Sequence, residues 1–189
     1  MQSIEELNAI GWGYAEDVLS GAIPACKNIQ QTCARALAMR DNPEFYYDAD
    51  KAVKPVRFAL FLRHLKGPLA GERITLEPWQ IFMISQIYGW FRVDNDRRVV
   101  RTIYCEVARK NGKSTLLSVL SLYHLLADGE ASAEVYAAAV TRDQARIVFG
   151  DAQAMVRGSP DLSKALGVHR SNIFHTASNS KFEPLAAEA

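Results

Sequence analysis

The hydrophobic positions near the N-terminus recur with a helical period. Apolar residues stand every three or four positions from Ile4 to Val18, which predicts an amphipathic helix. The S-x-x-E sequence from Ser3 to Glu6 is a capping box that would begin this helix. Gly21 supplies the residue at which such a helix commonly ends. The chain is therefore expected to open with a capped helix that has one apolar face.

Two further helical patterns follow this first one. The second begins at Pro24, a residue suited to the first position of a helix, and stops at Asp41-Asn42-Pro43. The third runs from Val56 to Leu65 and stops at Gly67-Pro68. The residues expected to be buried on the second helix are Cys26, Ile29, Cys33 and Leu37.

From Pro78 onward the pattern alternates between helices and strands. A helix is predicted to begin at Pro78 and to continue through Trp90. Residues 97–107 predict a strand whose part from Arg101 to Cys105, rich in β-branched and aromatic side chains, would be buried. The apolar run 116–126 contains neither Pro nor Gly and predicts a buried helix.

The C-terminal part continues the same alternation. Residues 134–140 predict a second buried strand, and the T-x-x-Q sequence from Thr141 to Gln144 predicts the start of another helix. A hairpin is expected around Ser178-Asn179. Alternating strands and helices indicate an α/β fold, a parallel sheet with helices on both faces.

The stretch between the first predicted strand and the helix after it carries the candidate chemistry. It contains Gly112-Lys113-Ser114, and a strand, a short loop, these three residues and a helix make the layout of a P-loop. Backbone N–H groups of such a loop face phosphates, the lysine reaches the β- and γ-phosphates, and the serine hydroxyl binds Mg²⁺. The pattern departs from G-x-x-x-x-G-K-[ST] because Val107 replaces the first glycine. A basic surface turn is the alternative interpretation, and Arg109 and Lys110 fit either one. With the P-loop interpretation, the expected fold is a P-loop NTPase-like parallel sheet with helices on both faces. Residues 1–43 would then form an N-terminal helical region and residues 44–189 a partial P-loop ATPase domain.

A second candidate site lies upstream of the loop, in the first turn of the helix that begins at Pro78. Trp79 and Gln80 stand there. A primary amide has both a donor and an acceptor, so Gln80 could satisfy N6 and N7 of an adenine. The alternative is a surface glutamine beside a core tryptophan. A P-loop later in the chain favours the adenine-binding interpretation.

Composition narrows the class of protein. A formal net charge of +1 argues against a global field that would draw the chain to nucleic acid or to a membrane. The three cysteines, at irregular spacing, match neither a disulfide framework nor a zinc motif. The acidic N-terminus does not resemble a signal peptide, and the longest apolar run is too short to span a membrane. These features predict a soluble, cytoplasmic protein.

Several of these motifs together resemble the large terminase subunit of tailed bacteriophages. The resemblance extends over residues 45–189, including a P-loop in which Arg-Lys-Asn-Gly-Lys-Ser stands where other ATPases carry more glycine. The motifs that carry it are Leu76-Glu77-Pro78-Trp79-Gln80, Tyr88-Gly89-Trp90, Ala108-Arg109-Lys110-Asn111-Gly112-Lys113-Ser114, Val135-Tyr136-Ala137-Ala138-Ala139, Arg142-Asp143-Gln144-Ala145 and Ser180-Lys181-Phe182.

The resemblance implies an ATP-driven motor that packages double-stranded DNA into procapsids with ATP and Mg²⁺ as cofactors. It implies the portal protein and the small terminase subunit as partners, with a homo-oligomer possible and no membrane, in the bacterial host cytoplasm. Lys113 would be central to catalysis and Arg109 the extra cation near the γ-phosphate. The nucleotide-binding residues would be Trp79, Gln80, Arg109, Lys110, Asn111, Gly112, Lys113, Ser114 and Thr115, with Ser114 on the metal.

The chain departs from the family by lacking the acidic strand and the nuclease domain expected downstream. We expect it to hydrolyse ATP weakly or not at all by itself. Two alternatives stay open at this point. One is another P-loop DNA or RNA translocase, such as a helicase-like ATPase, and the other is a non-catalytic nucleotide-binding remnant.

Overall fold

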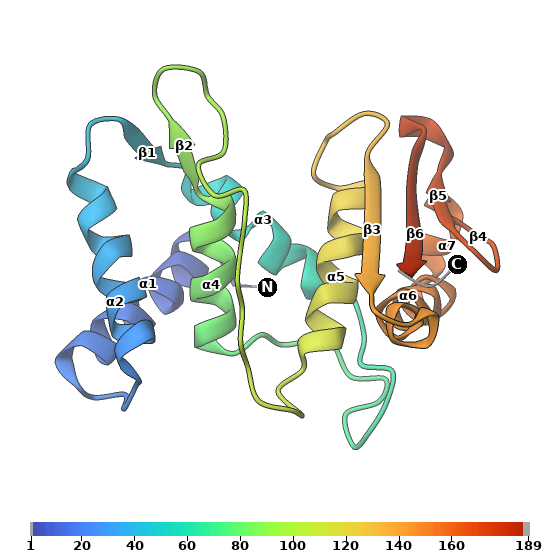
Figure 1. Ribbon diagram of the computed structural model, residues 1–189, viewed down its shortest axis with the longest axis horizontal. Helices are drawn as coiled ribbons and strands as arrows, with labels where there is room; N and C mark the ends of the chain where they lie inside the picture. The colour runs from blue at the N-terminus through green and yellow to red at the C-terminus, as the bar shows by residue number, and fades with distance from the viewer. Residues whose placement is uncertain (1, 187–189) are drawn as a thin grey trace. The chain divides into compact units, whose positions relative to one another are not determined.

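The computed structural model describes residues 2–186, and its backbone contacts divide the chain into two compact units (Figure 1). The first unit comprises the chain up to Arg57 together with Thr75–Cys105. The second comprises Phe58–Ile74 and the chain from Glu106 onward. Each unit is described by itself below. A division into a helical region of residues 1–43 and an ATPase domain of residues 44–189 stays a prediction.

The first unit is mainly helical. Its helix α1 packs against α2 and α4, and its two short strands form an antiparallel pair in which Tyr47 lies opposite Trp90. The elements are α1 (Ile4–Ser20), α2 (Lys27–Ala38), the 3₁₀ turn η1 (Met39–Asp41), β1 (Phe45–Tyr47), α3 (Ala49–Ala59), α4 (Pro78–Tyr88) and β2 (Trp90–Arg92).

The first predicted helix is confirmed together with both of its caps. The Ser3 side chain accepts a hydrogen bond from the N–H of Glu6, and the Glu6 carboxylate accepts one from the N–H of Ser3. Gly21 ends the helix with φ of 83°, a left-handed conformation that glycine adopts without steric cost. Local sequence is sufficient here because each cap is made by residues within one turn of the helix end.

The second helix begins later than predicted, at Lys27 instead of Pro24. The N–H of Ile23 donates to the carbonyl of Asp17, so the residues after Gly21 reverse the chain direction against α1 and are not available to start a helix. Cys33 and Ala36 are buried on α2, whereas Cys26 and Ile29, which we expected in the core, are exposed. Desolvation raises the pKa of the buried Cys33 thiol.

The third and fourth helices also differ from prediction at their ends. Helix α3 starts at Ala49, and the Asp48 carboxylate caps it by accepting from the N–H of Lys51, 2.9 Å away. It stops at Ala59, short of the predicted Leu65. Helix α4 ends at Tyr88, and Trp90 belongs to β2. A Cβ atom on Gly89 would lie 2.4 Å from the Tyr47 ring, so the chain passes the ring closely at that glycine.

An aromatic cluster with one polar connection forms part of the core of the first unit. The ring of Trp12 meets the rings of Tyr47, Phe82 and Trp90 edge-on, at centroid distances of 5.3, 6.5 and 6.3 Å. The hydroxyl of Tyr47 donates to Oδ1 of Asn8 at 2.7 Å. The amide nitrogen of Asn8 in turn lies 2.9 Å from the carbonyl oxygen of Ile4 and 3.0 Å from that of Ala49. Asn8 therefore joins α1 to β1 and α3.

The half-buried position of Tyr47 predicts a loss of stability at alkaline pH. Burial raises the pKa of its phenol from 10.0 to about 12, so the folded state favours the neutral form. The contribution of this neutral phenol to the free energy of unfolding is complete below pH 10. It falls as the pH rises towards 12, because the phenol ionises at a lower pH in the unfolded chain than in the folded one. The fall is on the order of 2 kcal/mol. Urea unfolding of wild type and Tyr47→Phe between pH 8 and pH 11.5 should show a difference that narrows above pH 10. A constant difference would contradict this assignment.

The second unit joins helices to a mixed four-stranded sheet, which confirms the α/β class (Figure 1). Strands β3 and β6 are parallel, whereas β6–β5 and β5–β4 are antiparallel, so the sheet is not the purely parallel one predicted. The elements are α5 (Lys113–Leu126), β3 (Glu134–Ala139), α6 (Arg142–Arg157), α7 (Pro160–Ala165), β4 (Gly167–Val168), β5 (Ile173–His175), η2 (Thr176–Ser178) and β6 (Ser180–Ala186).

Helices α5 and α6 contact both β3 and β6 and pack against each other. The ring of Phe149 on α6 meets that of Phe182 on β6 at 5.3 Å, and Phe182 is fully buried. On β3 the alternate residues Glu134 and Tyr136 are exposed. Strand β3 is therefore half-buried, not buried on both faces as predicted.

The predicted strand leading into the phosphate loop does not form in the described chain. Residues 101–107 have no regular secondary structure, and the Tyr104 side chain is 88% exposed. A strand requires a hydrogen-bonded neighbour, and the sheet of the second unit does not include this segment. The predicted hairpin is confirmed, with Asn179 in a left-handed conformation between η2 and β6. No helix among residues 2–186 is both long and apolar enough to cross a membrane.

Candidate phosphate-binding loop

The loop before α5 makes its turn at two left-handed residues. Lys110 and Gly112 both have φ of 71°, and Gly112 is the N-cap of α5. Val107 keeps a negative φ. A β-branched residue is therefore compatible with this position, which explains how the loop forms without the first glycine of the usual pattern. The left-handed conformation of Lys110 costs about 1–2 kcal/mol, which the surrounding contacts must offset.

Side chains of the loop fold back onto its own backbone. The ammonium group of Lys113 donates to the carbonyl oxygen of Val107. The side-chain amide of Asn111 donates to the carbonyl of Ala108 at 3.2 Å. The segment from Val107 to Lys113 is thus closed at both ends by its own side chains, and the Lys113 ammonium lies against the loop.

The first turn of α5 supplies unbonded amide groups. The first bond of the helix runs from the N–H of Leu116 to the carbonyl of Gly112 at 2.9 Å, so the N–H groups of Lys113, Ser114 and Thr115 precede it. Such groups have no acceptor within their helix and point out of its N-terminal end, where they attract anions. Further along, the buried Ser118 hydroxyl lies 2.8 Å from the carbonyl oxygens of both Ser114 and Val148. This contact fixes α5 against α6.

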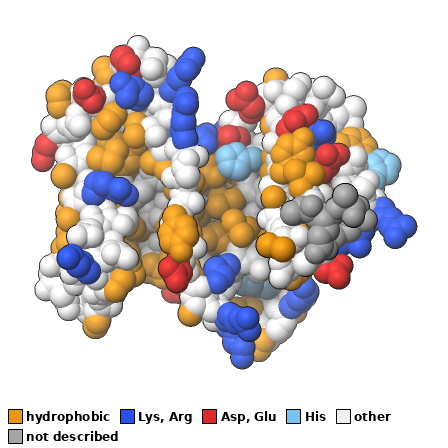
Figure 2. Space-filling model, in the orientation of Figure 1, with side chains coloured by type: hydrophobic (Ala, Val, Ile, Leu, Met, Phe, Trp, Pro, Cys, Tyr) orange, Lys and Arg blue, Asp and Glu red, His pale blue; other side chains and the backbone are white. Residues whose placement is uncertain are grey.

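Positive charge gathers at this loop although the whole chain is nearly neutral. Arg109, Lys110 and Lys113 are all exposed, and Glu106 is the only carboxylate in residues 106–115. Figure 2 shows Lys, Arg, Asp and Glu side chains spread over the visible face, in agreement with the nearly neutral total. The donors of the loop suit a polyphosphate, and the half-buried Ser114 contributes a hydroxyl, an oxygen donor of the type that Mg²⁺ accepts.

The two residues predicted to bind adenine lie in the other unit. Trp79 and Gln80 stand in the first turn of α4, whereas residues 109–115 lie together in the second unit. Gln80 is buried, and its side-chain oxygen accepts from the N–H of Glu77 at 2.9 Å, so it helps to cap α4. Trp79 is half-buried. The adenine role of both residues stays a prediction, and the capping bond is a structural role that sequence reasoning missed.

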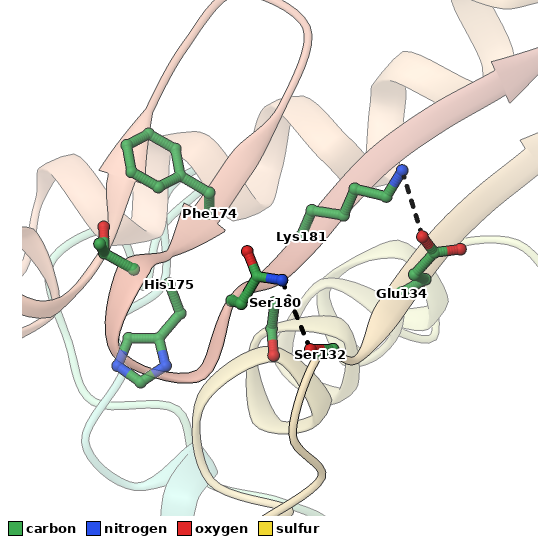
Figure 3. Close-up of a pocket in the computed structure, with 8 residues that line it drawn as sticks. Ser132, Glu134, Phe174, His175, Ser180 and Lys181 are labelled. Atoms are coloured by element: carbon green, nitrogen blue, oxygen red, sulfur yellow. Dashed lines mark hydrogen bonds and ion pairs between the residues drawn. The ribbon is translucent and has the colours of Figure 1, made fainter.

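A hollow in the second unit is lined by none of the residues 107–115. It has a volume of about 400 Å³ and opens beside Glu134, His175 and Lys181 (Figure 3). The Lys181 ammonium lies 3.4 Å from the Glu134 carboxylate and 3.5 Å from that of Glu183. The Tyr136 hydroxyl and Lys181 together lower the pKa of Glu134. Two carboxylates against one ammonium leave this network with a net negative charge, so the hollow is unsuited to a phosphate.

Gly112 is expected to be essential to the shape of the loop. With φ of 71°, an alanine at this position would cost about 1–2 kcal/mol and would shift the start of α5. Gly112→Ala should therefore weaken Mg-ATP binding, while the unfolding midpoint falls only slightly. Gly150→Ala, in α6 with nothing within 4 Å of the added Cβ, is the control that should bind normally. Equal affinity of Gly112→Ala and wild type in titration calorimetry would refute this role.

Comparison with known proteins agrees with this geometry. The family model described as terminase large subunit, ATPase domain, matches residues 78–189. The large terminase subunit of Enterobacteria phage HK97 is 30% identical over 126 residues, which cover 65% of this chain and 24% of that protein. The crystal structure of the HK97 bacteriophage large terminase is similar with a TM-score of 0.62 and 26% identity, over 74% of this chain and 28% of that one. The chain thus spans about a quarter of the length of these relatives, and it belongs to the terminase large-subunit ATPase-domain family.

Proposed function

We propose that this chain binds Mg-ATP through residues 109–115 as part of a motor that packages double-stranded DNA into procapsids. One observation carries the proposal. A preformed loop, turned at Lys110 and Gly112 and lined by Arg109 and Lys113, stands at the N-terminus of a helix in a member of the terminase ATPase family. Cations and unbonded backbone amides at a helix N-terminus are the donors that a triphosphate requires.

Each residue of the loop has a proposed role. Lys113 exchanges its bond to the Val107 carbonyl for the β- and γ-phosphates, and Arg109 is the additional cation at the γ-phosphate. Asn111 holds the turn through its bond to Ala108. The Ser114 hydroxyl is the proposed ligand of Mg²⁺. The backbone amides from Gly112 to Thr115 face the phosphates, Lys110 adds positive charge, and Trp79 and Gln80 are the proposed adenine contacts.

The wider setting follows from the family. We propose double-stranded DNA as the substrate that is moved, and the portal protein and small terminase subunit as partners in the host cytoplasm. The name of the HK97 relative states that it is a large terminase subunit, and this chain would contribute the corresponding N-terminal ATPase part.

Titration calorimetry of this chain with Mg-ATP tests the proposal. We expect saturable binding of Mg-ATP, weaker binding of ATP in EDTA, and no detectable binding of adenosine, because the loop contacts phosphates. Adenosine binding as tight as that of Mg-ATP would show that the phosphates contribute nothing. Absence of Mg-ATP binding by a protein with a cooperative unfolding transition would reject the proposal.

A further inference from the structure

An ordered loop between α3 and α4, residues Arg63–Arg73, projects from the second unit and is called the basic loop here. Its flanking residues Leu62 and Ile74 are buried, and the N–H of Ile74 donates to the carbonyl of Leu62 at 2.9 Å. Arg63 and Arg73 face each other in an antiparallel bridge. The N–H of His64 donates to the carbonyl of Glu72 at 2.9 Å, which extends the pairing by one step. The loop is thus anchored at its base.

The tip of the basic loop is held by its own backbone. The N–H of Ala70 donates to the carbonyl of Gly67 at 3.1 Å, and the N–H of Gly71 donates to that of His64 at 2.8 Å. Gly67 and Gly71 adopt φ of 75° and 88°, which few other residues tolerate. The Lys66 ammonium lies 2.6 Å from the Asp151 carboxylate on α6, which fixes the side of the tip. A loop ordered in this way loses little conformational entropy when it binds a partner.

The charges on this loop are arranged unfavourably for an isolated protein. Arg63 and Arg73 are exposed, directly opposite each other, and neither forms an ion pair with a carboxylate of the described residues. Like charges at opposite positions of a strand pair destabilise it. The guanidinium of Arg63 donates to the carbonyl of Gly71 at 2.7 Å, a neutral acceptor that leaves its charge uncompensated. The two arginines would be stabilised by an anion bound across them.

Apolar side chains stand beside these cations. Phe61, just before the basic loop, is 66% exposed, and Leu69 at its tip is 49% exposed. Cations interleaved with exposed apolar groups suit a phosphate backbone, where the cations meet phosphates and the apolar groups contact sugars. A small anion would engage the arginines alone, whereas a polyanion can also compete with Asp151 for the exposed Lys66 ammonium.

We propose that the basic loop is a contact for the phosphate backbone of duplex DNA, with Arg63, Lys66 and Arg73 as the cations. The choice of DNA as the polyanion rests on the proposed packaging function. The contact is independent of sequence, because it involves phosphates and sugars and no base edge. It is also separate from the nucleotide loop, since no residue is shared between them.

Fluorescence anisotropy with a labelled 30-base-pair duplex tests this contact. Lys66→Gln/Arg73→Gln is expected to weaken binding roughly tenfold at low salt and to reduce the salt slope by about 1.8, which is 0.9 for each lost phosphate contact. The matched control Lys164→Gln/Arg170→Gln removes the same two charges from exposed positions of the same unit. It should retain the wild-type slope. Lys164, like Lys66, forms an ion pair, in this case with Asp161 at 3.6 Å.

Three results would overturn the proposal: no DNA binding by the wild-type chain, equal slopes for the two double variants, or a change confined to self-association in sedimentation. The last would make the loop a protein contact. Mg-ATP calorimetry on the same proteins keeps the two proposals distinguishable. If all the proteins bind Mg-ATP and the double variant Lys66→Gln/Arg73→Gln binds DNA as wild type does, only the basic-loop proposal is rejected. If that double variant weakens DNA binding but none of the proteins binds Mg-ATP, only the ATP-site proposal is rejected.

Discussion

Lys113→Ala is expected to weaken Mg-ATP binding by about 10- to 150-fold. The lysine supplies a hydrogen bond to a charged group, and such bonds contribute about 1.5–3 kcal/mol, which corresponds to that range of affinity. In the chain without nucleotide the ammonium bonds the Val107 carbonyl, so the substitution also removes one closure of the loop. Titration calorimetry against Mg-ATP measures the effect directly.

A second lysine variant serves as the control for charge. Lys164→Ala removes an exposed ammonium on α7, in the same unit, and should bind Mg-ATP as wild type does. Equal affinities for Lys113→Ala and wild type would show that residues 107–115 form a basic surface turn. Equal weakening in both variants would show that net charge, and not the position of Lys113, governs binding.

Phe182→Ala is expected to lower the free energy of unfolding of the second unit by about 3–5 kcal/mol. The ring is fully buried and meets Phe149 of α6, so its removal leaves a cavity between the sheet and the helix. Urea unfolding followed by far-ultraviolet circular dichroism measures the change. Because a domain of this size is stabilised by about 5–15 kcal/mol, a loss of that size would bring it close to unfolding at 37 °C.

A residue on the same strand provides the comparison. Leu185 stands three positions further along β6 and is 44% exposed, so Leu185→Ala should change the unfolding free energy by less than about 0.5 kcal/mol. Similar losses for both variants would show that the register of β6 against β3 differs from the pairing of Phe182 with Val135. The pair of measurements therefore tests which face of the sheet the helices cover.

Elements with local signals agree best between sequence and structure. Helix α1 was predicted with both ends because Ser3, Glu6 and Gly21 make its caps within single turns. Helix α5 was predicted from an apolar run, and the loop before it from Gly112-Lys113-Ser114. The shape of this loop also depends on residues close in sequence, since its turn is made by the conformations of Lys110 and Gly112.

Elements that need a distant partner agree least. Residues 101–107 have the side chains of a buried strand, yet no strand of the described sheet pairs with them. Trp90 reads as part of a helix by period alone, but it pairs with Tyr47, distant in sequence, and so belongs to β2. Gln80 was predicted to bind adenine through its amide. In the structure Gln80 is buried, and its side-chain oxygen accepts from the N–H of Glu77 at the start of α4.

The amino-acid sequence by itself determined the α/β class, the capped first helix, the start of α5 after Gly112 and the family of this protein. Each of these depends on residues adjacent in the chain or on the order of motifs along it. Only the tertiary structure decided that the sheet is mixed, that Val107 is compatible with the loop, and that Arg63 and Arg73 stand opposite each other. The physical reason is that strand direction, backbone φ and the pairing of like charges are set by the neighbours that folding brings together, and residue order alone does not specify those neighbours.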